Sequence, residues 1–435
     1  MTHTIVIADD VTGANDIGIM YAKAGLDVLV YSQGEEGDTP SYAPCDVLVV
    51  DTDSRFDTYE TAYAKVRRAV AQAPREGVRQ YIDKQCSVFR GNIGAEFDAM
   101  LDELGEEFAV VVLGFPNNGR TTLHSVHYVF GVKLEDSQFR HDPVHPMTRS
   151  DLREILGSQT KRRVSAIHYE LYDEGIGAVR EALEHERRQG GYCIMDVRDN
   201  RDLELLADLL AEEKIVCGSS ALSEYLARVQ RFDEKPQESA RPVCGDSRVL
   251  CIAGSLTPQT LRQTQWMKEK GYRTFELDTR RLLDGGQYEA ECARMAASAA
   301  EALEATGFAM VHSMQTPELV EETKRLAAER GVGNTAVSSL VSGALSRVAR
   351  QVVAESGVRR IIVCGGDTSA AICAGLGVDG MRVLREIETG LPTCQSVKAP
   401  YYELVLKSGS FGSPEFIEKA IRVLREDADN SKEES

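Results

Sequence analysis

Short apolar runs alternate with amphipathic stretches along most of the chain. Runs rich in Val and Ile predict buried strands, whereas apolar residues that recur at helical spacing predict helices. In the first half we expect strands at Thr4–Ala8, Val28–Tyr31, Val47–Val50, Arg79–Ile82, Ala109–Leu113, Val164–Ile167 and Tyr192–Val197. Helix candidates between them include Thr58–Ala73, Gly94–Leu104, Ile176–Arg188 and Leu203–Glu212.

A second series of the same kind begins at residue 249. Its predicted strands are Val249–Ala253, Arg273–Leu277, Ala309–His312, Ile361–Cys364 and Glu403–Leu406. Its longest helix candidates are Tyr288–Ala305 and Ser338–Ser356. Strands that alternate with helices in this way are typical of an α/β fold with a mainly parallel sheet.

The segment FDEKPQESARPVCGDSR, residues 232–248, interrupts this alternation. It is polar, holds two prolines and has no period, so we expect a linker. The chain would then comprise two α/β domains, residues 1–231 and 249–426, with mainly parallel sheets and a ligand cleft between them. We expect the charged segment 427–435 to be a disordered tail.

Composition narrows the class of protein. The 435 residues hold 68 Asp and Glu against 50 Lys and Arg, an acidic balance that argues against a sequence-independent grip on nucleic acid. No apolar run approaches the length of a membrane span, and the N-terminus lacks the pattern of a secretion signal. The ten cysteines form no C-x-x-C pair and are expected to be reduced core thiols. We therefore expect a cytoplasmic protein with no membrane partner.

Charged residues follow several predicted strands of the first domain. The strand ends carry Asp9 and Asp10; Asp51, Asp53, Ser54 and Arg55; Lys84, Ser87, Arg90 and Asn92; and Asn117, Asn118 and Arg120. Ligands of open α/β sheets bind beyond the carboxyl ends of the strands, so these residues should converge. The mixture fits a small acid with several hydroxyls, because Arg binds carboxylates bidentately. The alternative is a solvated rim with local ion pairs.

The adjacent pair Asp9 and Asp10 could cap a helix, hold a metal, accept a proton or bind a hydroxyl-rich substrate. Neighbours in an extended strand point to opposite faces. We therefore expect one carboxylate to face the ligand and the other to cap the following helix or pair with a basic residue. Either residue fits either role.

Small, hydroxyl-bearing turns follow three strands of the second domain. They are AGSLTPQT, CGGDTSAA and KSGSFGSP, each before a helix-like run. Glycines let a backbone approach phosphate closely, and helix N-termini present free N–H groups. Taken singly these turns could be simple helix caps, but three in one domain indicate a nucleotide-phosphate site. The chain has no P-loop motif, and the second domain's turns lack the dinucleotide fingerprint.

Several motifs resemble the four-carbon acid sugar kinase family, which includes threonate, erythronate and 3-oxo-tetronate kinases. They are ADDVTGANDIG, DTDSR, FRGNIGAE, FPNNGRTT, GVKLEDSQFRHDPVHP, AGS, CGGDTSAA and SGSFG, in that order. The resemblance implies ATP-dependent phosphorylation of a primary hydroxyl on a sugar acid. It places the sugar acid on the N-terminal domain and the nucleotide on the C-terminal domain.

The resemblance also implies roles for individual residues. The substrate-binding set is Asp9, Asp10, Arg55, Lys84, Ser87 and Arg90, with Asp9 and Asp10 as catalytic candidates. The nucleotide-binding set is Ser255, Gly365, Gly366, Asp367, Thr368, Ser369, Gly409, Ser410 and Gly412. The expected cofactors are ATP and Mg²⁺, with Lys407 helping to hold the phosphates and no metal cage made by the protein alone. The expected partner is a small-molecule sugar acid, with a homodimer possible.

Two positions depart from the family pattern K-x-D-S-T-[LF]-R-G-N. Cys86 stands at the acidic position and Val88 at the hydroxyl position. A pocket changed in this way should prefer a different pattern of hydroxyls. A branched relative such as 3-oxo-isoapionate is then an alternative to threonate or erythronate. The competing functions are a sugar-acid dehydrogenase, and a two-lobed binding protein without catalysis.

Overall fold

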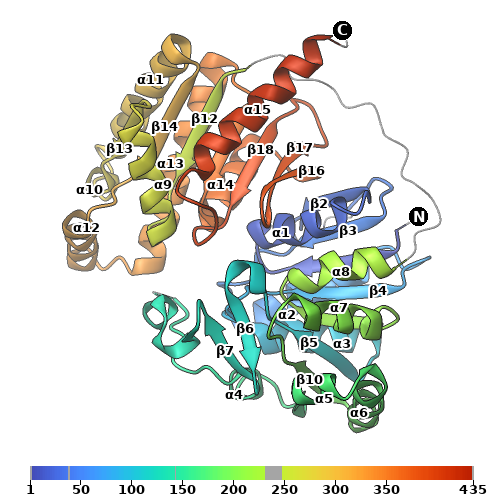
Figure 1. Cartoon of the computed structure of the whole chain (residues 1–435). Helices are drawn as coiled ribbons and strands as arrows, with labels where there is room; N and C mark the ends of the chain where they lie inside the picture. Colours follow the sequence, from blue (N-terminus) through green and yellow to red (C-terminus); the bar gives the residue numbers. More distant parts are fainter. Residues whose placement is uncertain (1, 38–39, 143, 231–246, 434–435) are drawn as a thin grey trace. The chain divides into compact units, whose positions relative to one another are not determined.

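The computed structural model describes residues 2–37, 40–142, 144–230 and 247–433. The chain divides into two compact units, Met1–Gln237 and Glu238–Ser435. Of the expected linker 232–248, all but residues 247 and 248 lies outside the described residues. Both units combine a large sheet with helices, which confirms the predicted α/β class (Figure 1).

The large sheet of the first unit is entirely parallel, in the order β2-β3-β1-β4-β11-β5-β10-β9. Most of its strands are nearly continuous runs of buried apolar residues, as expected where helices cover both faces, whereas β4 is buried but carries polar residues and the edge strand β9 is partly exposed. They are β1 (Thr4–Ala8), β2 (Val28–Ser32), β3 (Val47–Asp51), β4 (Gln80–Lys84), β5 (Phe108–Val112), β9 (Val164–Ile167), β10 (Gly191–Met195) and β11 (Ile215–Gly218).

The helices of this unit form two groups, since α2 packs on α3 while α8 packs on both α1 and α7. They are α1 (Val11–Ala22), α2 (Tyr59–Gln72), α3 (Ile93–Leu104), α4 (Leu152–Gly157), α5 (Glu170–Asp173), α6 (Ile176–Gln189), α7 (Asn200–Leu210) and α8 (Ala221–Val229). A small antiparallel sheet, β6-β7-β8, is inserted after β5. Its strands are β6 (Arg120–Leu123), β7 (Val126–Val129) and β8 (Val132–Lys133).

The sheet of the second unit has the order β13-β14-β12-β15-β18-β17-β16. The first five strands are parallel, and β17 and β16 continue the sheet in antiparallel fashion. The strands are β12 (Val249–Ala253), β13 (Thr274–Leu277), β14 (Phe308–Ser313), β15 (Arg360–Cys364), β16 (Gly380–Glu388), β17 (Leu391–Ser396) and β18 (Glu403–Lys407).

Two groups of helices also pack in this unit: α9 with α15, and α13 with α11 and α14. The helices are α9 (Pro258–Glu269), α10 (Thr279–Leu282), α11 (Tyr288–Thr306), α12 (Pro317–Glu329), α13 (Asn334–Ser356), α14 (Gly366–Leu376) and α15 (Phe416–Glu433). The backbone of α15 continues to Glu433, whereas the sequence predicts a disordered tail from residue 427. The packed, apolar start of α15 propagates helix into a charged segment that would not form one alone.

The strand predictions are correct in position but incomplete. The bounds of β1, β9 and β12 agree with the prediction, and the other predicted strands differ by one to a few residues. The strands β11, β16 and β17 and the small sheet were missed. Nine of the ten cysteines lie in the described residues; none of these nine is in a disulfide, and all but Cys86 are buried.

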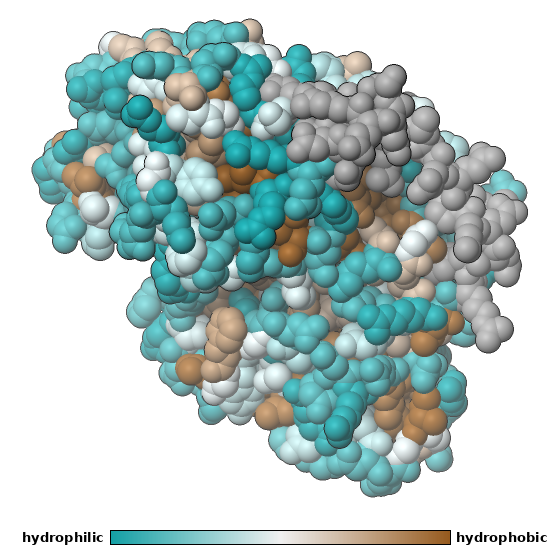
Figure 2. All heavy atoms as spheres, turned by 45° about the horizontal axis from the view of Figure 1, so that its top comes forward, coloured by the Kyte–Doolittle hydropathy of each residue, from teal (hydrophilic) through white to brown (hydrophobic). Residues whose placement is uncertain are grey.

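Eight large apolar side chains of the described residues are exposed. Among the described residues, no helix is both long and apolar enough to span a bilayer. Apolar side chains on the face in Figure 2 are dispersed among hydrophilic ones. The most exposed large apolar residue of the described part is Phe130, after β7, and Arg120 lies over its ring.

Candidate active site

The sheet order brings the charged strand ends of the first unit together. Strand β1 lies between β3 and β4, and its last residue, Ala8, is in register with Asp51 on β3 and Lys84 on β4. The three strands therefore end at one level. The turns that follow them place Asp9, Asp10, Arg55 and Lys84 side by side, as the parallel arrangement predicts.

Arg55 binds both carboxylates of the opening pair. Its Nε and Nη2 donate to the two oxygens of Asp9 at 2.7 and 2.8 Å, and its Nη1 donates to Asp10 Oδ2 at 2.6 Å. All three side chains are buried. Buried carboxylates are stable only when paired and hydrogen-bonded, so one guanidinium compensates two negative charges here. We call this group the Arg55 clamp.

Asp10 is also the N-cap of α1. Its Oδ1 accepts from the backbone N–H of Gly13 at 2.7 Å, and its Oδ2 accepts from Thr12 Oγ1 at 2.8 Å. Burial alone would raise the pKa of Asp10, but the charges of Arg55 and Lys84 and these hydrogen bonds lower it. The structure thus assigns the cap to Asp10. Both carboxylates nevertheless pair with Arg55, so the expected division between a ligand-facing and a basic-paired residue is not observed.

Lys84 extends the group toward α1 and α8. Its Nζ lies 3.3 Å from Asp16 Oδ2, which also accepts from Ser220 Oγ at 2.7 Å. The second oxygen, Asp16 Oδ1, is buried without a hydrogen-bond partner among the described residues. Gly13 permits this packing, because a Cβ there would lie 2.7 Å from Asp10 Oδ1 and 3.1 Å from Lys84 Nζ.

The other two predicted substrate residues lie on the turn after β4. Ser87 is buried, and its carbonyl accepts from His127 Nε2 at 2.9 Å. Arg90 pairs with Asp142, donates to Cys86 Sγ at 3.4 Å and lies over the ring of Phe139. Neither side chain joins the Arg55 clamp through a direct hydrogen bond that the structure shows.

Cys86 lies near positively charged side chains. It interacts electrostatically with the guanidinium groups of Arg55, Arg90 and Arg120. Burial lowers the pKa of Arg120, the last of the three, more than Cys86 and Asp16 raise it. The thiol of Cys86 therefore contacts one guanidinium, that of Arg90, and interacts electrostatically with those of Arg55 and Arg120.

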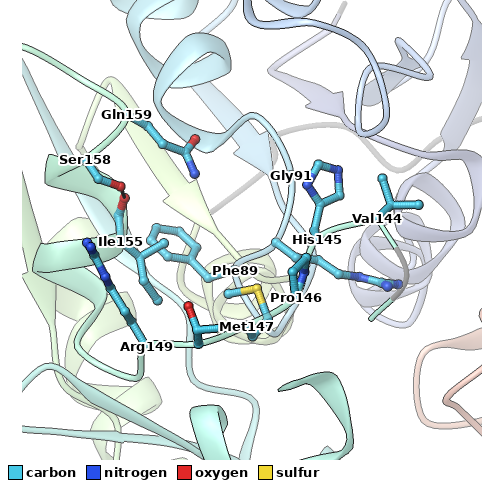
Figure 3. Close-up of a pocket in the computed structure, with 12 residues that line it drawn as sticks. Phe89, Gly91, Val144, His145, Pro146, Met147, Arg149, Ile155, Ser158 and Gln159 are labelled. Atoms are coloured by element: carbon cyan, nitrogen blue, oxygen red, sulfur yellow. Dashed lines mark hydrogen bonds between the residues drawn. The ribbon is translucent and has the colours of Figure 1, made fainter. Parts of the chain in front are cut away.

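A cavity of about 360 Å³ opens beside this turn. In Figure 3, Ile155, Ser158 and Gln159 lie on one side of the cavity and Val144 and His145 on the other, with Phe89 between them. Arg90 and Arg149 also line it. The His145 Nε2 lies 2.9 Å from the carbonyl of Arg55 in a hydrogen bond, and burial lowers the pKa of His145. A side chain that lines the cavity therefore bonds to the backbone of Arg55, the residue whose guanidinium forms the clamp.

A second layer of acids lies behind the clamp. Gln85 Nε2 donates to Asp83 Oδ1 and to Glu96 Oε2, both at 2.7 Å, and Ser54 Oγ donates to Glu96 Oε1 at 2.9 Å. Burial raises the pKa of Asp83 to about 8, and burial with the charge of Asp83 raises the pKa of Glu96 well above its usual range. Burial thus favours the protonated form of both acids, which limits further negative charge beside Asp9.

Several residues of this region were not in the predicted site. Asp16 and Asp142 complete ion pairs with Lys84 and Arg90, and Asp83 and Glu96 form the protonated layer. A carboxylate within the otherwise apolar helix α1 was a usable signal for Asp16. Asp142 lies within the motif GVKLEDSQFRHDPVHP, but its pairing with Arg90, 52 residues away in the chain, could not be predicted from the motif.

The three small turns of the second unit also converge, since β12, β15 and β18 are neighbours. Gly254 and Ser255 donate backbone N–H bonds to Cys364 O, and Gly365 donates to Lys407 O at 2.8 Å. The tight fit excludes larger side chains. A Cβ on Gly409 would lie 2.3 Å from Ser255 Oγ, and one on Gly254 would lie 2.1 Å from Thr368 Oγ1.

Most of the predicted nucleotide residues belong to this glycine-rich cradle. Gly365 is the N-cap of α14, and Gly366, Asp367, Thr368 and Ser369 form its first turn, with Asp367 exposed. Ser255 and Thr257 begin the turn before α9, and Thr257 Oγ1 donates to Gly409 O. Ser410 and Gly412 lie on the turn after β18 and are partly exposed. Free N–H groups at the start of an 11-residue helix suit an anion.

Lys407 does not have the expected orientation. Its Nζ is fully buried and lies within 3.2 Å of Thr260 Oγ1 and the carbonyls of Ser408, Gly409 and Phe411. Burial lowers the pKa of Lys407 to about 8. The side chain therefore shapes the turn after β18 from inside, and the prediction that it holds phosphate directly is wrong for this structure.

Comparison with known proteins matches the two units to two different domain families. A sugar-binding N-terminal domain family matches residues 4–226, and a nucleotide-binding C-terminal domain family matches residues 250–417. A 3-oxo-tetronate kinase of Pectobacterium atrosepticum is 32% identical, covering 95% of this chain and 97% of its own. One of Brucella melitensis is 29% identical, covering 98% and 96%. A crystal structure from Salmonella typhimurium LT2 has a TM-score of 0.81 at 29% identity, covering 97% and 100%.

The protonated layer predicts a specific pH dependence of stability. A carboxyl group whose pKa is raised on folding binds more protons in the folded state, so its contribution falls as pH rises toward the folded pKa. Between pH 5 and 8.5, wild type should lose about 1 kcal/mol or more of unfolding free energy relative to Asp83→Asn. Urea unfolding at several pH values measures this difference.

The exposed residue Asp208 on α7 provides the control. The profile of Asp208→Asn should run parallel to that of wild type. If Asp83→Asn also ran parallel to wild type, Asp83 would be ionised in the folded protein at neutral pH.

Proposed function

The chain belongs to the four-carbon acid sugar kinase family, and we propose that it uses ATP to phosphorylate the terminal hydroxyl of a small sugar acid. Candidate substrates are four-carbon acids, such as threonate, erythronate or a 3-oxo acid, and branched relatives. The observation that carries the proposal is the presence of an Arg-clamped carboxylate site in one unit and a glycine-rich anion cradle in the other. The named relatives support a 3-oxo acid as the first substrate to test.

In the proposed sugar-acid site, Arg55 holds the carboxylates of Asp9 and Asp10 in place and does not bind the substrate carboxylate. Three of its nitrogens already donate to Asp9 and Asp10. Asp10 is 8% exposed, whereas Asp9 is inaccessible, so Asp10 is the better candidate to orient the attacking hydroxyl. The unpartnered Asp16 Oδ1 is a further acceptor for a substrate hydroxyl. Lys84 and Arg90 supply positive charge for the carboxylate.

Phosphoryl transfer needs accurate positioning and charge neutralisation more than a strong base. A lowered pKa suits Asp10 to this task, because the carboxylate stays ionised and holds the hydroxyl in a fixed direction. The hydroxyl proton can pass to Asp10 as the new P–O bond forms. Such a carboxylate typically contributes about a hundredfold or more to turnover.

In the proposed nucleotide site, the cradle binds phosphate oxygens through backbone N–H groups. The start of the first turn of α14, from Gly366 to Thr368, supplies these groups and the Thr368 hydroxyl, while Ser369 donates its own N–H and Oγ to Gly365 O and stabilises the turn. Ser255, Gly409, Ser410 and Gly412 provide the opposing wall, which Lys407 supports from within. Mg²⁺, when bound with ATP, would neutralise phosphate charge while keeping several waters. The exposed carboxylate of Asp367 fits such a cation, since alone it would repel phosphate.

The proposal predicts ADP release that depends on a sugar acid and on Mg²⁺. Purified chain should release ADP from ATP with at least one C4 or branched sugar acid, and chelation of Mg²⁺ should abolish release. Asp10→Asn should lower turnover by about a hundredfold or more, while Asp208→Asn should leave it unchanged. A coupled assay of ADP release over a panel of acids measures the dependence on the acid, the dependence on Mg²⁺ and the effect of each variant.

Background ADP release with every acid would contradict the kinase proposal. Binding of an acid without turnover would then favour the two-lobed binding protein. Oxidation of an acid with a dinucleotide would favour the dehydrogenase. Full turnover by folded Asp10→Asn would remove that residue from the mechanism.

The charge environment of Cys86 predicts an effect on substrate choice. Cys86→Asp places a carboxylate beside Arg90 and within the electrostatic influence of Arg55 and Arg120, and Val88→Thr adds a hydroxyl at a buried position. Together they should change the kcat/KM ratio between two sugar acids by about tenfold or more, because unmade hydrogen bonds discriminate strongly. The control is Cys86→Asn with Val88→Thr. Asn is close in shape to Asp but carries no charge, so this variant should change the ratio less. Equal ratios in all three proteins would show that this turn does not select substrate.

A further inference from the structure

A cluster of metal-ligand type lies apart from the Arg55 clamp. One ligand atom from each of His124, His168 and Asp196 lies within 4.8 Å of the other two. His124 is at the turn between β6 and β7, His168 follows β9, and Asp196 follows β10. In the sheet order, β11 and β5 separate β10 from β4, the strand that carries Lys84. The cluster therefore belongs to a different group of strand ends.

The backbone fixes the carboxylate of Asp196. Its Oδ2 accepts from the N–H of His124 at 2.8 Å, and its Oδ1 accepts from the N–H of Ser125 at 2.9 Å. His124 and Ser125 have φ of 50° and 64°, a turn conformation that points both N–H groups at one carboxylate. The N–H of Tyr169 also donates to Oδ2, at 3.4 Å, and donors of this kind orient a metal-binding carboxylate.

Among the described residues, Asp196 forms no ion pair with a lysine or an arginine. Its side chain is inaccessible, and its ion pair among the described residues is with His168 Nδ1 at 3.2 Å. Glu170 Oε1 lies 3.0 Å from His124 Nε2 and adds a second carboxylate. The basic side chains of this region are already paired with other acids: Arg198 with Asp173 and Asp202, and Arg153 with Asp151. A divalent cation with affinity for imidazole nitrogen would bind both histidines and pair with the buried carboxylate of Asp196.

We propose that His124, His168 and Asp196 bind a divalent transition-metal ion of the zinc class. Two imidazoles and one carboxylate are a frequent zinc set, and a fourth position is open to water. Mg²⁺ is the wrong ion, because it prefers oxygen ligands throughout. The bound ion links the β6–β7 hairpin to the ends of β9 and β10. This site is independent of the nucleotide and of the kinase proposal.

Isothermal titration of the untagged, chelator-treated chain with ZnCl₂ tests the site. We expect one ion per chain at micromolar or tighter affinity, and about 10–100-fold weaker affinity for His124→Ala and for His168→Ala. Both rings are partly exposed, so both variants should fold, which thermal unfolding without metal verifies. The control His185→Ala changes an exposed histidine on α6 and should bind as wild type does.

Cobalt provides a second readout with the same proteins. Co²⁺ bound by the cluster should give visible absorption bands in wild type and His185→Ala, and these should vanish in His124→Ala. Absence of stoichiometric zinc binding to wild type would overturn the proposal. Equal affinity in wild type, His124→Ala and His168→Ala would also overturn it, because the ion would then bind elsewhere.

Discussion

One guanidinium between two adjacent carboxylates is the constraint on which the first unit depends. Asp9 and Asp10 follow directly from a buried strand, and neither has access to enough solvent to remain charged alone. Arg55 reaches both because β3 lies next to β1 and ends at the same level. The parallel order, the turn DTDSR and the small Gly13 are all needed for this contact. The protonated layer of Asp83 and Glu96 behind it keeps the number of buried charges low.

The two units treat their strand ends in different ways. The first unit concentrates ionised side chains, which can bind hydroxyls and a carboxylate in defined directions. In the second unit, glycines lie in the turns after the central strands, and the start of α14 presents backbone N–H groups. Even the lysine that ends β18, Lys407, is directed into the protein to hold carbonyls. This contrast is what a reaction between a small hydroxy acid and a polyphosphate requires.

Much of this arrangement could be predicted from the sequence. Buried parallel strands are continuous apolar runs, so the bounds predicted for β1 and β12 agree with the structure; those of the partly exposed edge strand β9 agree as well. The convergence of Asp9, Asp10, Arg55 and Lys84 follows from a general property of parallel sheets. The strand β11 was missed because IVCG is a short run beside a lysine, and β16 because REIE within it is polar and half-exposed.

Side-chain directions were harder to predict than strand positions. Lys407 has a long flexible chain, and only the fold shows that its ammonium lies under its own turn. Strand alternation predicted opposite faces for Asp9 and Asp10, yet β1 ends at Ala8, so the rule does not extend to them. His124, His168 and Asp196 come together from three separate elements, and sequence spacing gives no sign of it.

Equilibrium urea unfolding of Arg55→Met tests the importance of the clamp most directly. Removing the guanidinium leaves two buried carboxylates without compensation, which should lower the unfolding free energy by about 3–5 kcal/mol. The matched control is Arg67→Met, which breaks an exposed ion pair with Glu103 and should leave the unfolding midpoint unchanged. An equally small effect of Arg55→Met would contradict the account, because Asp9 and Asp10 would then not depend on Arg55.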